Sequence, residues 1–200
     1  MKKFVITVGL IGLIVGLFVG AFLLLNFRLM QSQMLSDSTI ASYHTGSPDE
    51  KVTIVSDVTG LYVDPSIRFA QSLQDEIKSR LENQPQVGEV TAVNLPMDKA
   101  DIPLLFVEVN QQKKLWTPFY ANSAYEVIVY YASNGDISFR HSQPVHFESN
   151  SDQQAISYRA SYALVDRSFG LISSPGYQDY LVHQIADRVQ MVFEHKVKSY

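Results

Sequence analysis

The chain has 200 residues, of which 46% are hydrophobic, and a formal net charge of −4. Three of its 16 basic residues, Lys2, Lys3 and Arg28, flank an apolar run, whereas all 20 acidic residues lie beyond it, so the remainder carries a net charge of −7. An acidic domain without a basic stripe is a poor binder of nucleic acid or anionic lipid headgroups. The absence of cysteine excludes disulfides, thiol catalysis, cysteine–zinc sites and a lipid-modified cysteine.

An uninterrupted apolar run from Phe4 to Phe27 is the strongest pattern in the sequence, with no charged side chain between Lys3 and Arg28. A helix rises about 1.5 Å per residue, so the run is long enough to cross a hydrocarbon core of roughly 30 Å. It predicts a membrane anchor over residues 1–28, with a single transmembrane helix at about 4–27.

The flanking charges predict the orientation of this helix. Lys2 and Lys3 outnumber Arg28, so we expect a cytoplasmic amino terminus and an extracytoplasmic domain in a single-pass protein of the cell membrane. A cleavable signal peptide is the alternative, but its apolar core is typically about 7–15 residues long. The one acceptable cleavage site, Val19-Gly20-Ala21, lies deep inside the run, so we favour an uncleaved anchor.

Four glycines recur along one face of the predicted anchor: Gly9, Gly12, Gly16 and Gly20. At about 100° per residue they fall within an arc of roughly 80°. Such spacing lets two helices approach closely in lipid and is compatible with a homodimer. Glycine is also common in membrane helices that do not pair, and both interpretations stay open.

Residues 29–50 are predicted to be a flexible tether, because they are rich in serine and glutamine and end in the turn-forming Thr45-Gly46-Ser47-Pro48. Residues 51–200 remain for one extracytoplasmic domain of common size.

The first half of this domain combines strand and helix patterns. Short β-type runs lie at 52–55 and 61–63. Asp64-Pro65 predicts a helix start, because aspartate caps free amides and proline suits the first helical position. Apolar residues at spacings of three and four predict its buried face. They are Ile67, Ala70, Leu73, Ile77 and Leu81.

The second half contains mainly strand patterns. Segments 87–95, 104–109 and 125–133 are rich in β-branched and aromatic residues, Asn134-Gly135 predicts a hairpin turn, and alternation predicts a strand over 156–164. Ser173-Ser174-Pro175 then predicts the start of a final helix that extends to about Lys196. Its expected buried face consists of Tyr177, Leu181, Ile185, Val189, Val192 and Phe193.

These elements predict an α+β protein: an N-terminal transmembrane helix, then a two-layer domain with an antiparallel sheet and two main helices. The element order β-α-β-β-β-β-α over 52–193 resembles that of small periplasmic accessory domains, such as those of outer-membrane assembly and transporter-associated lipoproteins. The resemblance rests on element order alone and concerns the fold, which does not imply a function. Those proteins usually carry a lipidated cysteine, which this chain lacks.

The sequence contains no recognisable catalytic signature, neither a Gly-x-Ser-x-Gly elbow nor a His-Glu-x-x-His motif nor a phosphate-binding glycine loop. His141 and His146, near Glu148, are the best metal candidates. Residues five apart on a strand face opposite sides, so we assign no metal and no cofactor. Paired acids such as Asp75-Glu76 fall on a helix face or in polar turns, where solvation accounts for them.

The segment 113–122 is the best candidate for partner binding. It holds the only tryptophan, two further aromatic residues and two lysines between predicted strands. Aromatic and basic side chains dominate the energetics of many interfaces. The candidate residues are Lys113, Lys114, Trp116, Phe119 and Tyr120. The alternative is a long hairpin whose aromatic rings fold back onto the core.

The sequence therefore favours a membrane-tethered, non-catalytic interaction or accessory domain on the outer face of a bacterial cytoplasmic membrane. Its expected partner is an envelope protein or a second copy of the chain. The first alternative is a ligand-binding or transport-accessory module with an apolar pocket between helices and sheet. The second is a hydrolase without a recognisable motif, which needs ionisable groups that meet in one cleft.

Overall fold

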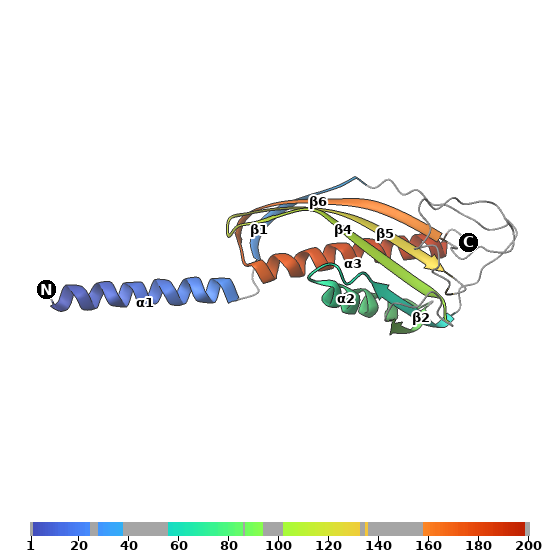
Figure 1. Cartoon of the computed structure of the whole chain (residues 1–200), viewed down its shortest axis with the longest axis horizontal. Helices are drawn as coiled ribbons and strands as arrows, with labels where there is room; N and C mark the ends of the chain where they lie inside the picture. Colours follow the sequence, from blue (N-terminus) through green and yellow to red (C-terminus); the bar gives the residue numbers. More distant parts are fainter. Residues whose placement is uncertain are drawn as a thin grey trace, which may run out of the picture.

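The computed structural model describes residues 2–24, 28–37, 56–85, 87–93, 102–132, 135 and 158–198 (Figure 1). Three helices and six strands follow one another in these segments. They are α1 (Lys2–Leu24), β1 (Arg28–Asp37), β2 (Ser56–Val63), α2 (Ala70–Glu82), β3 (Val87–Ala92), β4 (Leu104–Trp116), β5 (Tyr120–Ala132), β6 (Tyr158–Ile172) and α3 (Ser174–Lys198).

The six strands form one sheet in the order β1-β6-β5-β4-β2-β3. The α+β class is therefore confirmed, but the expectation of an antiparallel sheet is wrong, because β2 pairs in parallel with both β3 and β4. The cause lies between β2 and β3: the chain returns through α2, and a helical crossover makes the strands that it joins parallel. Figure 1 shows α2 and α3 on the same side of the sheet.

Helix α1 extends from Lys2 to Leu24, where the sequence predicts a helix at about 4–27, and Figure 1 shows it projecting away from the sheet. Its described side chains, from Ile6 to Phe22, are mostly exposed. Within the described stretches of the chain, no helix reaches the combined length and apolarity that define a membrane span.

Residues 28–37 differ from the sequence-based expectation. They were expected to belong to the end of the anchor and to a flexible tether, yet they form β1, which pairs antiparallel with β6 from Arg28↔Ile172 to Asp37↔Ala163. The local sequence does not predict this strand. It forms because pairing with a distant strand overrides the weak local preference of these residues. The rest of the predicted tether, 38–50, lies outside the described residues.

Helix α2 begins later than predicted. Asp64 accepts a hydrogen bond from the Ser66 amide at 2.8 Å, but this closes a local turn, and the helix starts only at Ala70. The Asp64 amide donates to the Val107 carbonyl of β4 at 3.0 Å, which keeps this residue attached to the sheet. The apolar periodicity is confirmed, since the helix buries Leu73, Ile77 and Leu81.

Helix α3 begins where the sequence predicts. The Ser173 hydroxyl accepts a hydrogen bond from the Gly176 amide at 3.0 Å, which satisfies one of the amides that a helix start leaves unpaired. All six apolar residues expected on its buried face are buried: Tyr177, Leu181, Ile185, Val189, Val192 and Phe193.

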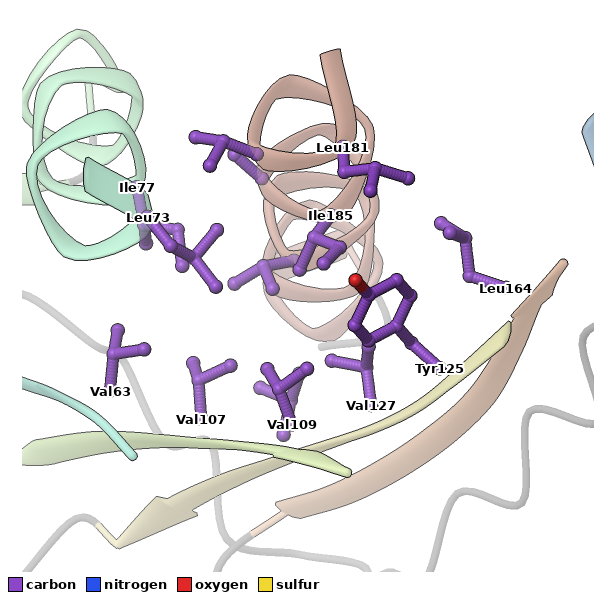
Figure 2. Packing of buried hydrophobic residues seen from close by; sticks show 14 of the residues in the cluster. Val63, Leu73, Ile77, Val107, Val109, Tyr125, Val127, Leu164, Leu181 and Ile185 are labelled. Atoms are coloured by element: carbon purple, nitrogen blue, oxygen red, sulfur yellow. The ribbon is translucent and has the colours of Figure 1, made fainter. Parts of the chain in front are cut away.

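The core lies between the two helices and the sheet. Figure 2 shows Leu73 and Ile77 of α2 and Leu181 and Ile185 of α3 above the side chains of the strands, which include Val127. The two helices are also joined by charge, because Arg80 of α2 binds Glu76 at 2.7 Å and pairs with Asp187 of α3.

We predict that Ile185→Ala lowers the free energy of unfolding by about 2–5 kcal/mol, because it opens a cavity at a fully buried position between α3 and the sheet. Chemical denaturation measures the change. Met191→Ala on the exposed face of the same helix is the matched control and should change stability by less than about 0.5 kcal/mol. Equal effects at both positions would contradict the packing.

Candidate interaction surface at the β4–β5 turn

The segment 113–122, which the sequence places between two strands, forms the end of the hairpin of β4 and β5. Strand β4 continues to Trp116 and β5 starts at Tyr120, so only three residues, 117–119, lie between them. The Thr117 amide donates to the Tyr120 carbonyl at 2.8 Å, and the Tyr120 amide donates back to the Thr117 hydroxyl at 2.9 Å. These bonds fix the position of Phe119 at the turn.

Strand β6 supports the same turn from its other side. The Gly170 amide donates to the Phe119 carbonyl at 3.0 Å, and the Ile172 amide donates to the Pro118 carbonyl at 3.2 Å. Gly170 has φ of 122°, a conformation that residues with a Cβ rarely adopt. The turn is therefore held by three strand ends rather than by the hairpin alone.

The five predicted partner-binding residues divide between the two faces of the sheet. Lys114 and Trp116 pair with the buried Ser123 and Ala121, so they lie on the face that the helices cover. Trp116 is partly buried and packs against the core, in line with the alternative interpretation of this residue.

Lys113, Phe119 and Tyr120 lie away from the core. Lys113 is exposed, Tyr120 is half-buried, and Phe119 is 68% exposed. The five residues therefore do not form one surface. Of the five, only Lys113, Phe119 and Tyr120 are accessible to a partner in this structure.

Residues of β6 complete a surface that the sequence did not reveal. The ring of Phe169 lies 5.0 Å from the ring of Tyr120, centroid to centroid, and Phe169 is 58% exposed. Leu171 and Leu115 are also exposed nearby. We call Leu115, Phe119, Tyr120, Phe169 and Leu171 the apolar tip. Only the register of β5 against β6 brings Phe169 to Tyr120, and sequence patterns do not supply that register.

The apolar tip holds most of the exposed large hydrophobic residues whose side chains the structure describes beyond α1. Five such residues are exposed among these side chains, and four of them belong to the tip. The fifth is Met191 on α3. Such clustering is typical of interaction sites, whereas single exposed apolar residues are ordinary.

Lys114 is half-buried next to the tip. Burial lowers the pKa of its ammonium group, and the positive charge of Arg68 lowers it further. Two cations therefore lie close together at this end of the sheet, with no acidic residue anywhere in the segment 113–122.

A buried polar network lies beneath the tip. Asp166 of β6 is fully buried and accepts hydrogen bonds from the hydroxyls of Ser168 and Tyr177, each at 2.8 Å, and from that of Tyr180 at 3.4 Å. A buried carboxylate needs such donors. The network attaches the first turns of α3 to β6. A sequence signal existed, because Asp166 continues the inward alternation of Tyr162 and Leu164.

Three buried polar atoms near this network lack a hydrogen-bond partner within the described residues: Trp116 Nε1, Ser123 Oγ and Tyr125 OH. Burial raises the pKa of Tyr125 to about 12, and the nearby Ser123 hydroxyl offsets this only in part. Burial also raises the pKa of Tyr177, with the adjacent Asp166 contributing in the same direction. Both phenols therefore stay protonated at neutral pH.

The network has the chemistry of a structural support. Its carboxylate is occupied by hydroxyl donors. In the part of the chain that the structure describes, no three histidine, cysteine or acidic side chains lie close enough together to hold a metal ion. The metal-ligand candidates from the sequence, His141, His146 and Glu148, lie outside the described residues.

A separate, open depression of about 330 Å³ lies along β5 and β6. Ala124, Glu126, Ser161, Ala163 and Val165 form part of its lining. Small side chains on neighbouring strands leave this space. A ligand-binding module was expected to have its pocket between the helices and the sheet. Core side chains fill that space, and the depression lies elsewhere (Figure 2).

The four glycines of α1 have open space beside them in the described part of the chain. A Cβ built on Gly9, Gly12, Gly16 or Gly20 would meet no described atom within 4 Å. Helix pairing through the face they share stays a prediction.

No family model matches the sequence, and no curated protein matches it. Among solved structures, a dodecamer of a PelC variant from Paraburkholderia phytofirmans is similar at 11% sequence identity, with a TM-score of 0.40. The alignment covers 80% of this chain and 95% of that chain. A similarity of this size supports no conclusion about function.

We predict that Tyr125→Phe leaves stability at pH 7 unchanged or slightly raised, because the lost hydroxyl has no hydrogen-bond partner among the described residues. Stability of the parent protein should fall as pH rises from about 10, the ordinary pKa, toward about 12, because the unfolded chain releases the Tyr125 proton first. Denaturation at several pH values should show a shallower decline in Tyr125→Phe. An unchanged decline contradicts the assignment.

Proposed function

We propose that this chain is a membrane-tethered, non-catalytic interaction domain of the bacterial cell envelope. In this proposal α1 is anchored in the cytoplasmic membrane with its amino end inside, and the α+β domain lies on the outer face. The observation that carries the proposal is an exposed, apolar helix that ends at Leu24, four residues before the sheet begins at Arg28.

Exposure of α1 supports the anchor. Large apolar side chains such as Ile11, Leu13, Leu17 and Phe18 are more than half exposed, which is costly in water and favourable in lipid. The sequence extends the apolar run beyond the described side chains, to Phe4 and Phe27, without a charge. Two basic residues before the run and one after it support the proposed orientation.

The domain itself supports an interaction role. Its inward-facing carboxylate, Asp166, is engaged by tyrosine and serine hydroxyls, which makes it a structural group. Four of the five large hydrophobic residues that are exposed among the described side chains beyond α1 lie at the tip. The proposed partner is an envelope protein or a second copy of the chain. A second copy would pair through the glycine face of α1.

The open depression on β5 and β6 supports a second candidate, a ligand-binding module, because a concave site there could hold a small molecule. Ala124 and Ala163 are small residues that line the depression, so a larger side chain at either position tests whether a small molecule binds there. Ala163→Phe should fill the depression and abolish small-molecule binding while the membrane anchor stays intact.

We predict that Leu13→Arg shifts the full-length protein from the membrane to the soluble or aggregated fraction. A cation at the centre of a spanning helix costs about 2.5–3.5 kcal/mol. Alkaline extraction of membranes followed by immunodetection measures the distribution. Leu13→Val is the matched control, and it should remain resistant to extraction.

The same experiment tests the orientation. A tag after Tyr200 should be accessible to an impermeant reagent from outside the cytoplasm. Parent protein that is extracted as readily as the Leu13→Arg variant would contradict the anchor, and a carboxy-terminal tag protected on the cytoplasmic side would contradict the orientation.

A further inference from the structure

We propose that the apolar tip is a second membrane contact, which docks onto the surface of the bilayer that holds α1. This inference rests on the proposed anchor and names the partner of the tip: a lipid surface that contains anionic headgroups. Four observations carry it, and each concerns a different property of the same end of the sheet.

The first observation is the short connection between α1 and the tip. Strand β1 begins at Arg28, four residues after the end of α1 at Leu24. Four residues span at most roughly 14 Å. Arg28 pairs with Ile172, which directly follows the exposed Leu171. An anchored α1 therefore places this end of the sheet at the lipid–water boundary.

The second observation is the kind of surface exposed there. Phe119 and Phe169 are 68% and 58% exposed, and Leu115 and Leu171 add aliphatic side chains. Aromatic and aliphatic side chains of this kind penetrate the boundary between headgroups and acyl chains. The half-buried Tyr120 contributes a ring with a polar end, which suits that boundary as well.

The third observation is charge. No acidic residue lies in 113–122 or in 167–172, although the chain as a whole is acidic. Lys113 and Arg167 are exposed, and Lys114 lies half-buried near Arg68. The exposed charges at this end of the sheet are therefore positive, and the nearest carboxylate on β6, Asp166, is buried beneath the tip. The overall charge argued against anionic lipid, but the placement of the charges favours it at this one end.

The fourth observation is rigidity. The hydrogen bonds of Thr117 with Tyr120, and of Gly170 with the Phe119 carbonyl, hold Phe119 in its exposed position before any contact is made. A preorganised contact loses little conformational entropy on docking. A loose loop that carried the same residues would lose more.

The test uses full-length protein in vesicles made with brominated phosphatidylcholine, with or without phosphatidylglycerol. The tip reporter combines Trp116→Phe with Phe119→Trp, so the single tryptophan lies at the turn. Trp116→Phe removes an indole N–H that has no hydrogen-bond partner among the described residues. The control reporter combines Trp116→Phe with Met191→Trp, at a site that is exposed to a similar degree on α3.

We expect the tip reporter to lose most of its emission to bromine in vesicles with phosphatidylglycerol, whereas the control reporter keeps its emission. Adding Lys113→Gln should lower the ratio of docked to undocked protein about fivefold in anionic vesicles. Adding Phe169→Ser should lower it at least about tenfold. Thermal unfolding of each variant checks that the domain stays folded.

Three outcomes would overturn the inference while leaving the proposed anchor intact. Equal quenching of the two reporters would show no preferred docking face. Quenching that is insensitive to both Lys113→Gln and Phe169→Ser would show that the tip does not bind lipid. A photoreactive residue at position 119 that captures a polypeptide instead of lipid in native membranes would assign the tip to a protein partner. Protein that fails to float with the vesicles contradicts the anchor itself, and the inference with it.

Discussion

The pairing of β1 with β6 is the constraint on which the rest of the account depends. It joins residues 28–37, immediately beyond α1, to residues 163–172 in an antiparallel ladder. Because of this ladder the domain begins almost where α1 ends. A flexible tether would let the domain move freely at some distance from α1, whereas a strand of the sheet fixes one end of the domain close to α1.

The same ladder determines which end is near α1. Its first pair, Arg28↔Ile172, lies next to the β4–β5 turn, because Phe169 of β6 is opposite Tyr120 of β5. The exposed apolar residues and the local positive charge lie at this end. The buried network of Asp166, Ser168 and Tyr177 lies directly behind it and attaches β6 to α3. This end of the sheet therefore has an apolar surface and is held in place by buried hydrogen bonds.

The sequence predicted those parts of the fold that depend on local periodicity. The buried faces of α2 and α3 follow from spacings of three and four, and the start of α3 follows from the serine cap and Pro175. The parallel pairs around β2 were missed, because strand direction depends on the path of the connecting chain. Strand β1 was missed because its polar composition resembles that of a loop and its partner is more than a hundred residues away.

The candidate surface was predicted only in part, for the same reason. Lys113, Phe119 and Tyr120 were found from composition. Lys114 and Trp116 instead face the helices, because side chains alternate between the two faces of the sheet along β4. Phe169 and Leu171 were missed because they join the surface through strand register. Asp166 continues the inward alternation of β6, but alternation alone does not show that an acidic side chain there is buried, because its burial depends on hydroxyl donors from α3 and β6.

The central claim is that an anchored α1 and the β1–β6 ladder together hold the domain directly against the membrane. Neutron reflectometry of the full-length protein in a supported bilayer measures this most directly. The account predicts protein density that begins at the headgroup layer, with no hydrated gap below it. A layer of water between the headgroups and the domain, as wide as a flexible tether of some twenty residues allows (about 25 Å or more), would contradict it.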